Sequence, residues 1–295
     1  IIDTSDQQVI ILLTLLDNEY KQNTSIVSLH GSQYLQSIGS NSFQQCSNLI
    51  TIDLNGCTSL VSIGNNAFNN CDKLATVNFN NCSKLETIGS GAFDNCDEIT
   101  TIDFSDCTSL KSIDNIAFNN CDKLATVNFS NCGLLETIGS GTFDNCDEIT
   151  TIDFSDCTSL KSIDNIAFNN CDKLATVNFS NCGLLETIGD STFENCDEIT
   201  SIDFSDCTSL RSIGDNAFDN CNKLATVNFN NCGLLDTIGS NAFNNCDKLK
   251  TITMPVNKWI LITSNTKPEW AVTGSRNYVL SNNNLTRTKQ FGGYI

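Results

Sequence analysis

Apolar residues recur along the chain with a period of 25 residues. Leucines mark the same place in nine successive segments: Leu35, Leu60, Leu85, Leu110, Leu135, Leu160, Leu185, Leu210 and Leu235. The match is sharper at a period of 50, because residues 95–139 recur unchanged as residues 145–189. A fixed period in this range is typical of solenoids, in which each coil stacks on its neighbours. The repeating unit is therefore a pair of unlike coils.

Within one coil, the spacing of Leu124, Val127, Phe129 and Cys132 is that of a leucine-rich repeat. Val127 and Phe129 alternate with polar residues, which predicts a short strand with both side chains inward. The stretch 138–143 is too short and too glycine-rich for a helix. We therefore predict a curved, right-handed solenoid with a mostly extended or 3₁₀ convex side. It should have about ten short parallel strands, one for each segment that matches the period.

The equivalents of Val127 place the first of these strands at Val27 and the last at Ile252. Coils at the two ends of a solenoid need caps, because each coil buries its apolar face only against its neighbours. We predict an N-terminal cap at residues 1–25, a solenoid at 26–254, and a C-terminal cap and tail at 255–295. Both Trp and both Pro fall after residue 254, which marks the second boundary.

Charge and hydropathy narrow the possible partners. The chain has 16 Lys and Arg against 34 Asp and Glu, a formal charge of −18. A charge of this size repels nucleic acid and anionic membranes, so neither is expected as a partner. No apolar stretch reaches the roughly 18 to 20 residues of a membrane-spanning helix, so no transmembrane segment is expected in this chain. Because the chain does not begin with Met, we expect it to be the start of a mature or trimmed chain, whose signal or anchor, if any, lies outside this sequence.

The coil resembles the BspA-like leucine-rich repeats of bacterial and parasitic-protist surface proteins. The residues that carry the resemblance are Leu60, Ile63, Gly64, Ala67, Phe68, Cys71 and Leu74, and it extends over roughly residues 26 to 254. The resemblance implies a cell-surface or secreted protein used for adhesion, whose partner is a protein or glycan on a host cell or matrix. That family usually has Pro just after the strand, and here only Pro255 matches.

A second Cys in each coil, as at Cys132, resembles instead the cysteine-containing repeats of F-box proteins. This leaves open an alternative function as an intracellular scaffold or adaptor, although no F-box-like segment precedes the repeats. The sequence does not indicate an oligomeric state.

The 17 cysteines fall into two registers, with separations that alternate between 11 and 14 residues. Zinc needs four converging ligands, whereas each register supplies one thiol per coil, so no metal site is expected. Like cysteines on neighbouring coils should lie about 4.8 Å apart with parallel Cβ atoms, which exceeds the roughly 3.8 Å Cβ separation of a disulfide. We therefore predict a ladder of buried thiols that donate weakly to backbone carbonyls in the turns.

Catalysis is not expected. A thiol nucleophile needs a base, and the only imidazole is His30, which the pattern places just after the first strand as a solvated surface residue. Asp is abundant, but each Asp recurs with the coil and is interpreted as architectural. We predict a non-enzymatic protein with no cofactor.

Two polar columns are predicted to line the concave face of the solenoid and to bind the ligand. One column is Thr or Ser at the first strand position, and the other alternates Asp with Asn at the third. The candidate binding residues are Thr76, Asn78, Thr101, Asp103, Thr126, Asn128, Thr151, Asp153, Thr176, Asn178 and Asp203. The alternation also keeps like charges apart on adjacent strands. The Trp, Tyr and Arg residues that usually anchor tight interfaces are missing from these columns, so binding should be broad and multivalent.

Two further columns alternate in sign from coil to coil. They are Glu86, Lys111, Glu136, Lys161, Glu186, Arg211 and Asp236, and Lys73, Glu98, Lys123, Glu148, Lys173, Glu198 and Lys223. We expect ion pairs between adjacent coils, which penalise a one-coil slip in stacking and explain the double repeat without a ligand. Calcium between Asp103 and Asp153 is not expected at about 10 Å separation, whereas weak ion binding in single turns stays open.

Overall fold

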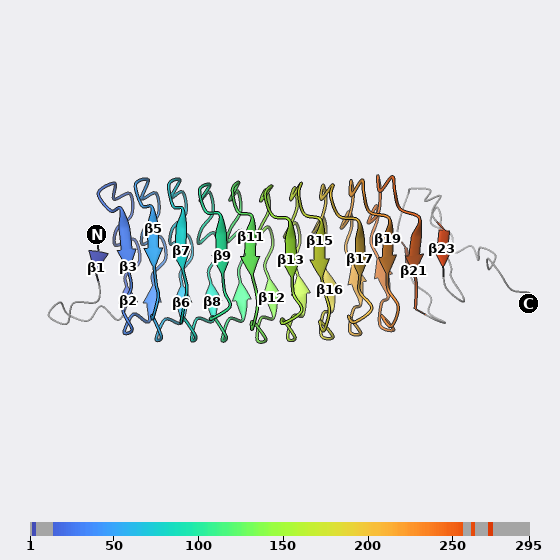
Figure 1. Ribbon diagram of the computed structural model, residues 1–295, viewed down its shortest axis with the longest axis horizontal. Helices are drawn as coiled ribbons and strands as arrows, with labels where there is room; N and C mark the ends of the chain where they lie inside the picture. The colour runs from blue at the N-terminus through green and yellow to red at the C-terminus, as the bar shows by residue number, and fades with distance from the viewer. Residues whose placement is uncertain (1, 4–13, 256–260, 263–270, 274–295) are drawn as a thin grey trace, which may run out of the picture.

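The computed structural model describes residues 2–3, 14–255, 261–262 and 271–273, and these form one elongated solenoid (Figure 1). Each coil contributes one strand of three residues and one of two residues, and all strand pairs are parallel. No helix occurs among the described residues. Since every coil repeats the same apolar spacing, each strand meets its own copy in the next coil. This confirms the predicted leucine-rich-repeat solenoid.

The three-residue strands, here called the long strands, form one face. They are β3 (Ser28–His30), β5 (Thr51–Asp53), β7 (Thr76–Asn78), β9 (Thr101–Asp103), β11 (Thr126–Asn128), β13 (Thr151–Asp153), β15 (Thr176–Asn178), β17 (Ser201–Asp203), β19 (Thr226–Asn228) and β21 (Thr251–Thr253). Two further strands, β1 (Ile2–Asp3) and β23 (Ala271–Thr273), extend this face at its ends.

The two-residue strands, here called the short strands, form the opposite face. They are β2 (Thr14–Leu15), β4 (Ser37–Ile38), β6 (Ser62–Ile63), β8 (Thr87–Ile88), β10 (Ser112–Ile113), β12 (Thr137–Ile138), β14 (Ser162–Ile163), β16 (Thr187–Ile188), β18 (Ser212–Ile213), β20 (Thr237–Ile238) and β22 (Leu261–Ile262). In the coil used for the prediction, the short strand overlaps the stretch 138–143 only at Ile138, and the rest of that stretch forms turns without a helix.

The two ladders differ in continuity. The short strands make one unbroken sheet of 11 strands, whereas the long-strand face is interrupted after β7, β11 and β15. We call these three interruptions seams. The inward valine just before each seam keeps slight solvent exposure, at 7% for Val77, 5% for Val127 and 6% for Val177. Val227, whose strand pairs on both sides, is exposed by only 1%. Between the seams the long strands are thus paired in twos, β9 with β11 and β13 with β15, in step with the 50-residue repeat, whereas the sheets at the two ends have four strands each.

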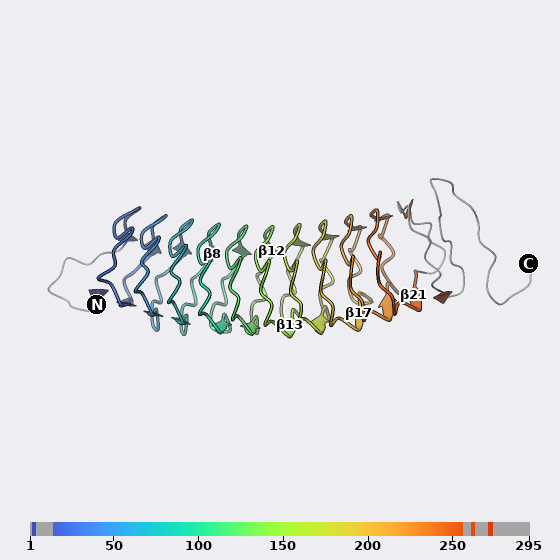
Figure 2. The same cartoon turned by 90° about the horizontal axis from the view of Figure 1, so that it is seen from above.

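The solenoid bends gently toward the short-strand face, so the long strands lie on the outer side of the bend (Figure 2). The prediction that the long strands line a concave face is therefore wrong for this chain. The physical reason is the ladder itself: the unbroken short-strand sheet keeps its strands at hydrogen-bonding distance, while the seams let the other face widen.

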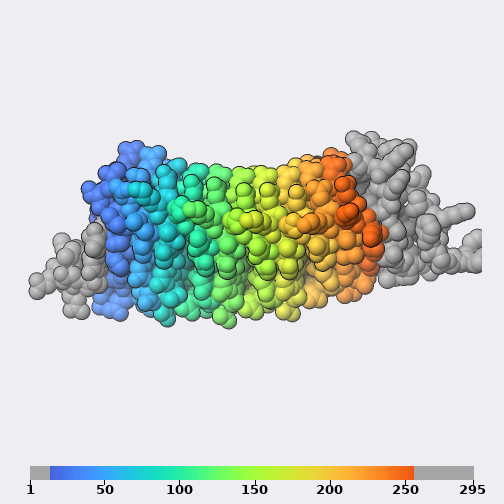
Figure 3. Space-filling model, turned by 45° about the horizontal axis from the view of Figure 1, so that its top comes forward, coloured from blue at the N-terminus to red at the C-terminus, as the bar shows by residue number. Residues whose placement is uncertain are grey.

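Two stacks of phenylalanine run along the core. One runs from Phe43 to Phe243 with ring centroids 5.1–5.5 Å apart. The other runs from Phe79 to Phe229 at 4.9–5.9 Å. Rings of the two stacks meet edge to face at 6.2–6.5 Å. Aromatic pairs prefer these arrangements, and Figure 3 shows the coils around them as successive bands that border only their sequence neighbours.

An asparagine ladder fixes one of the turns. Its members have left-handed backbones with φ between 53° and 61°, a conformation that Asn tolerates better than most residues. Each side-chain amide donates to the amide oxygen one coil earlier, at 2.7–3.1 Å, along Asn95, Asn120, Asn145, Asn170, Asn195, Asn220 and Asn245. This ladder was not predicted from the sequence. Its signal is the unbroken Asn at 25-residue spacing.

The first coil is two residues shorter than the rest. Leu29, not Val27, pairs with Ile52, and Leu29 is fully buried while Val27 is 46% exposed. The prediction that the first strand is centred on Val27 is therefore wrong. The turn that follows also lacks a cysteine and begins at Gly31, where an added Cβ would lie 2.2 Å from the Cys57 sulfur. Glycine lets the short turn close over the next coil.

Residues at the N-terminal side of this coil continue the stacking. The amides of Asn18, Tyr20 and Gln22 donate to carbonyls of the next coil, and the Tyr20 ring stacks 5.2 Å from Phe43. These contacts close the aromatic stack with a residue whose hydroxyl can face water. Most of the predicted caps, at 4–13 and 256–260 and further on, lie outside the described residues, so the cap boundaries stay predictions.

Candidate binding surface

The long strands carry all the candidate binding residues in two parallel columns. Thr or Ser occupies the first strand position and Asp or Asn the third, while the residue between them is buried. Thr76, Thr101 and Thr126 are exposed, and so are Asp153 and Asp203. The structure thus brings the predicted residues together as one strip. The strip lies on the outer face of the bend, not on the inner one.

The aspartates and asparagines of this strip are hydrogen-bonded in pairs. The Asn78 amide donates to Asp53, the Asn128 amide to Asp103, and the same bond recurs twice more, at 2.9–3.0 Å. In each case the accepting oxygen is Oδ1, which in all four pairs also accepts the backbone N–H two residues on, at 2.8–3.1 Å. These bonds connect only strands that are paired across the ladder. The alternation of Asp with Asn therefore builds the two-coil unit as well as separating charges.

The strip carries negative charge that basic side chains do not neutralise. Within residues 14–255, its only ion pair joins His30 Nδ1 to Asp53 Oδ2 at 3.7 Å. A second acidic column, which was not predicted to be part of the binding surface, lies three residues after the first, and its members are exposed: Asp106, Asp156 and Asp206. Carboxylates therefore concentrate on alternate coils of this face. A cationic partner would meet little competition there from the protein's own Lys and Arg.

The sign-alternating columns form the expected ion pairs. Lys111 lies 2.8 Å from Glu86, Lys123 lies 2.6 Å from Glu98, and the pattern continues at Lys161–Glu136, Lys173–Glu148, Arg211–Glu186 and Lys223–Glu198. Both partners of each pair are about half exposed, so each pair stabilises the fold by no more than about 1 kcal/mol. Because these charges have partners inside the protein, they offer less to a ligand than the strip does.

A like-charged column on the turn before the long strands was also missed. Six aspartates recur there at 25-residue spacing: Asp72, Asp97, Asp122, Asp147, Asp172 and Asp197. Partial burial raises the pKa of Asp97, and the neighbouring carboxylates of Asp122 and Asp72 raise it further. Burial likewise raises the pKa of Asp94, whose Oδ1 is buried without a hydrogen-bond donor. The repulsion and burial of these carboxylates therefore lower the stability of the fold at neutral pH. Mild acid, which protonates them, should raise the stability again.

Comparison with known families decides what kind of chain this is. The profile described as "BspA type Leucine rich repeat region (6 copies)" matches residues 14–146 and 136–266. The chain belongs to the BspA-type leucine-rich repeat family. The match confirms the resemblance seen in the sequence, and it extends over nearly all of the described residues. A search of curated proteins finds no match.

Solved structures of bacterial leucine-rich repeat proteins are similar to this chain. A leucine-rich repeat protein from Bacteroides ovatus is 20% identical over 78% of this chain and 87% of its own, with a TM-score of 0.40. A leucine-rich repeat protein of T. pallidum is 21% identical over 67% and 75%, with a TM-score of 0.46. A leucine-rich cell surface protein from Faecalibacterium prausnitzii is 20% identical over 83% of each chain, with a TM-score of 0.36. At these values the similarity says nothing about what this chain binds.

The second cysteine of each BspA-type coil extends a buried thiol ladder. All 17 thiols are unbridged, and all but Cys246 are buried. The nine cysteines of the Cys46 register donate to the backbone carbonyl 26 or 28 residues earlier, at 3.1–3.3 Å. Four of the Cys57 register do the same at 3.1–3.5 Å. The predicted cysteine ladder is confirmed, and its acceptors belong to the preceding coil.

We expect thiol titration of the native protein at pH 8 to give few reactive groups. Burial raises the pKa of Cys57, Cys71 and Cys82 to about 12, so almost no thiolate forms, and the sulfurs are also inaccessible. Unfolding in guanidinium without reductant should release all 17. A count near zero in the unfolded protein would reveal bridges and contradict the ladder.

The described residues hold no group of three or more His, Cys, Asp or Glu side chains arranged to bind a metal ion. His30 lies inside strand β3 at the position of Asp53 in the next coil, so its predicted place after the strand is wrong by the same two-residue shift that moves Val27. Its side chain is 44% exposed. Within the described part, no helix has the length and apolarity to cross a membrane.

Proposed function

We propose that this BspA-type chain is a non-enzymatic adhesion or ligand-binding protein, secreted or displayed at a cell surface. It recognises a protein or glycan of a host cell or matrix through the long-strand face. Family membership supports the binding role. The surface location rests on what the family resemblance implies.

The observation that carries the proposal is the uncompensated acidic strip. Asp103, Asp153 and Asp203 stand on alternate coils with hydroxyl-bearing Thr and Ser beside them, and no Lys or Arg of residues 14–255 pairs with them. The strip is regular over many coils and lacks large anchoring side chains. Such a surface suits a partner with repeated cationic or hydroxyl groups, bound by many weak contacts together.

We expect the triple variant Asp103→Lys, Asp153→Lys, Asp203→Lys to lose at least tenfold in binding to immobilised basement-membrane matrix. Reversing the charges turns attraction of a cationic partner into repulsion. The matching Asp→Asn variant should lose less, and it preserves the turn, because Asn128 already accepts the N–H of Ser130 in the same way. Binding of the native protein should also weaken as salt rises.

The control for this experiment exchanges charge elsewhere on the coils. In the variant Lys111→Glu, Lys161→Glu, Arg211→Glu, three ion pairs become like-charge contacts, so stability should fall while affinity per folded molecule stays nearly unchanged. Circular dichroism would establish folding of every variant. Normal binding by the folded Asp→Lys variant would assign recognition to another face.

An intracellular scaffold or adaptor is the second candidate function, favoured by the 17 unbridged thiols. Reducing compartments keep thiols in this state. A secretion signal in the complete gene product would decide against it. Failure to bind any matrix or cell surface, together with capture of one cytosolic partner by the same strip, would favour it.

A further inference from the structure

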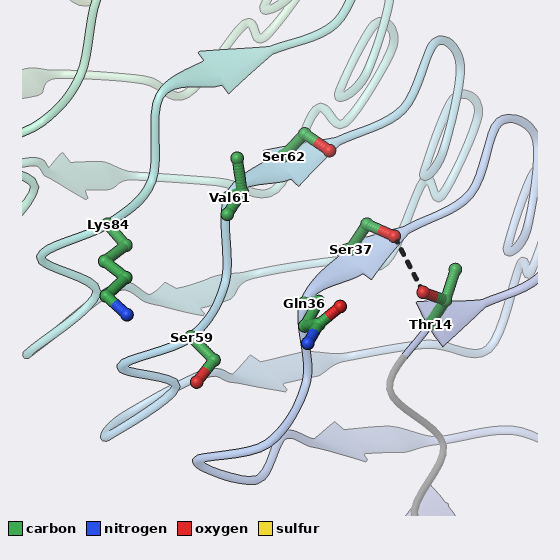
Figure 4. A pocket seen from close by; sticks show the side chains of 7 residues that line it. All are labelled: Thr14, Gln36, Ser37, Ser59, Val61, Ser62 and Lys84. Carbon is green, nitrogen blue, oxygen red and sulfur yellow. Dashed lines mark hydrogen bonds between the residues drawn. The ribbon is translucent and has the colours of Figure 1, made fainter.

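The short-strand face is hollowed near its N-terminal end. The hollow has a volume of about 390 Å³, and its lining residues come from four successive coils. Its lining residues are Thr14, Gln36, Ser37, Ser59, Val61, Ser62 and Lys84 (Figure 4). Figure 4 shows Thr14, Ser37 and Ser62 on the successive short strands β2, β4 and β6. Ser59 lies on the turn before β6, and Lys84 lies on the turn before β8. This volume lies in the range of small-ligand sites.

The hollow exists because the repeat is broken there. In later coils the positions of Gln36 and Val61 hold the sign-alternating pairs, such as Glu86 with Lys111, whose long side chains cross this surface. Gln36 and Val61 each occur once in that column. Ser37 and Ser62 also stand side by side, where later coils alternate Ser with Thr. The other coils are near copies of one another, so these exceptions to the repeat pattern are all found at the hollow.

Lys84 is the third departure. The same position two coils later holds Leu134, and then Leu184 and Leu234, so a lysine stands here alone. No carboxylate of residues 14–255 forms an ion pair with Lys84, and the neighbouring Glu86 is paired with Lys111 at 2.8 Å. In a chain with a formal charge of −18, the hollow therefore holds a local cation without a counter-charge. An anionic group on a ligand would supply one.

The other lining groups are suited to a hydroxyl-rich ligand. Four hydroxyls and the Gln36 amide offer donors and acceptors, and Ser37 Oγ already bonds to Thr14 Oγ1 at 3.2 Å. The Val61 side chain adds one apolar contact within this polar lining. Hydroxyl groups act as both donors and acceptors, so they match the alternating polarity of a sugar ring.

We propose that this hollow is a binding site for a carboxylated sugar residue of an acidic glycan. The Lys84 ammonium binds the carboxylate, and the Ser, Thr and Gln side chains hold the ring hydroxyls. The site lies on the face opposite the acidic strip. It is therefore independent of the recognition proposed for the long strands, and either can fail without the other.

The test is a ¹H–¹⁵N titration of the full chain at low salt with a disaccharide that contains glucuronic acid. The matched probe is the neutral disaccharide with glucose in its place. We expect the acidic probe to shift the amide signals of the hollow and to bind at least fivefold more tightly than the neutral one. Equal binding of the two probes, or shifts confined to other coils, would overturn the proposal. A tripeptide carboxylate that binds as tightly would overturn the sugar assignment.

The test variants use residues that already occur at the equivalent positions of other coils, so they should preserve the fold. Lys84→Leu installs the residue found at 134 and should lower affinity at least fivefold. The double variant Gln36→Glu, Val61→Lys restores the regular ion pair, fills the hollow, and should abolish binding. Exchanging the two residues, with Lys84→Leu and Leu134→Lys together, keeps composition and net charge, yet should not recover binding, since Glu86 and Lys111 occupy the equivalent surface. Unchanged affinity in Lys84→Leu would exclude the site.

Discussion

Deleting one coil, residues 120–144, is expected to destabilise the protein more than deleting the two-coil unit 95–144. The single deletion brings Lys111 beside Lys161, Glu98 beside Glu148, and Asp103 beside Asp153, whereas the unit deletion preserves every alternation. Three attractive contacts are lost and three repulsive ones formed, which together cost about 2 kcal/mol or more. Urea unfolding followed by circular dichroism would measure the difference.

Chain length alone would predict the opposite order of stability for the two deletion variants, since a solenoid with fewer coils has fewer stabilising interfaces. The unit-deleted protein should remain a folded, shorter monodisperse solenoid by gel filtration. If the single-coil deletion proved as stable as the unit deletion, coil identity would not matter, and the two-coil unit would be only a trace of sequence duplication.

We expect Phe118→Ala to lower the free energy of unfolding by about 3–5 kcal/mol, the usual cost of removing a buried aromatic ring. Phe118 is fully buried, stacks on Phe93 at 5.1 Å and on Phe143 at 5.5 Å, and meets Phe104 edge to face. Its removal leaves a cavity between two coils that the rigid backbone ladders keep apart. Denaturant unfolding is the measurement.

Phe243→Ala provides the comparison for this prediction. Phe243 is partly buried, and among the described residues it stacks on one ring, Phe218 at 5.4 Å. Its removal should cost clearly less than removal of Phe118. Equal costs at the two sites would mean that the stack contributes no more than ordinary burial.

Much of the fold could be predicted from the sequence because every coil repeats the same spacing of apolar residues. The spacing of Leu, Val and Phe fixes which residues point inward, and the observed strand Thr126–Asn128 has Val127 buried at its centre as predicted. The charge pairs follow from the same register. The first strand escaped prediction because counting by 25 cannot detect a turn shortened by two residues, which Gly31 permits.

The direction of the bend could not be deduced from apolar spacing. It depends on which of the two ladders is interrupted, and bonds such as Asn128 to Asp103 join strands that lie on the same side of an interruption. The asparagine ladder depends on backbone φ, which composition does not reveal. For the candidate site, the columns were predictable, whereas their place on the outer face was not.

The hollow was missed for a different reason. Periodicity draws attention to residues that recur, and the lining residues Gln36, Val61 and Lys84 are those that do not. Aligning the coils by column would have identified them. In repeat proteins, a departure from the column is thus as informative as the column itself.

The seams on the long-strand face give the solenoid an unequal stiffness. Opening the molecule at β7–β9, β11–β13 or β15–β17 breaks no strand pairing on that face, while the continuous short-strand sheet acts as the hinge. Flexing in the opposite sense would have to stretch that sheet and break its backbone hydrogen bonds. Under tension the protein should therefore bend in one plane, by opening at seams that lie two coils apart. The distances between contacts to a partner bound on the outer face would then increase before any coil unfolds.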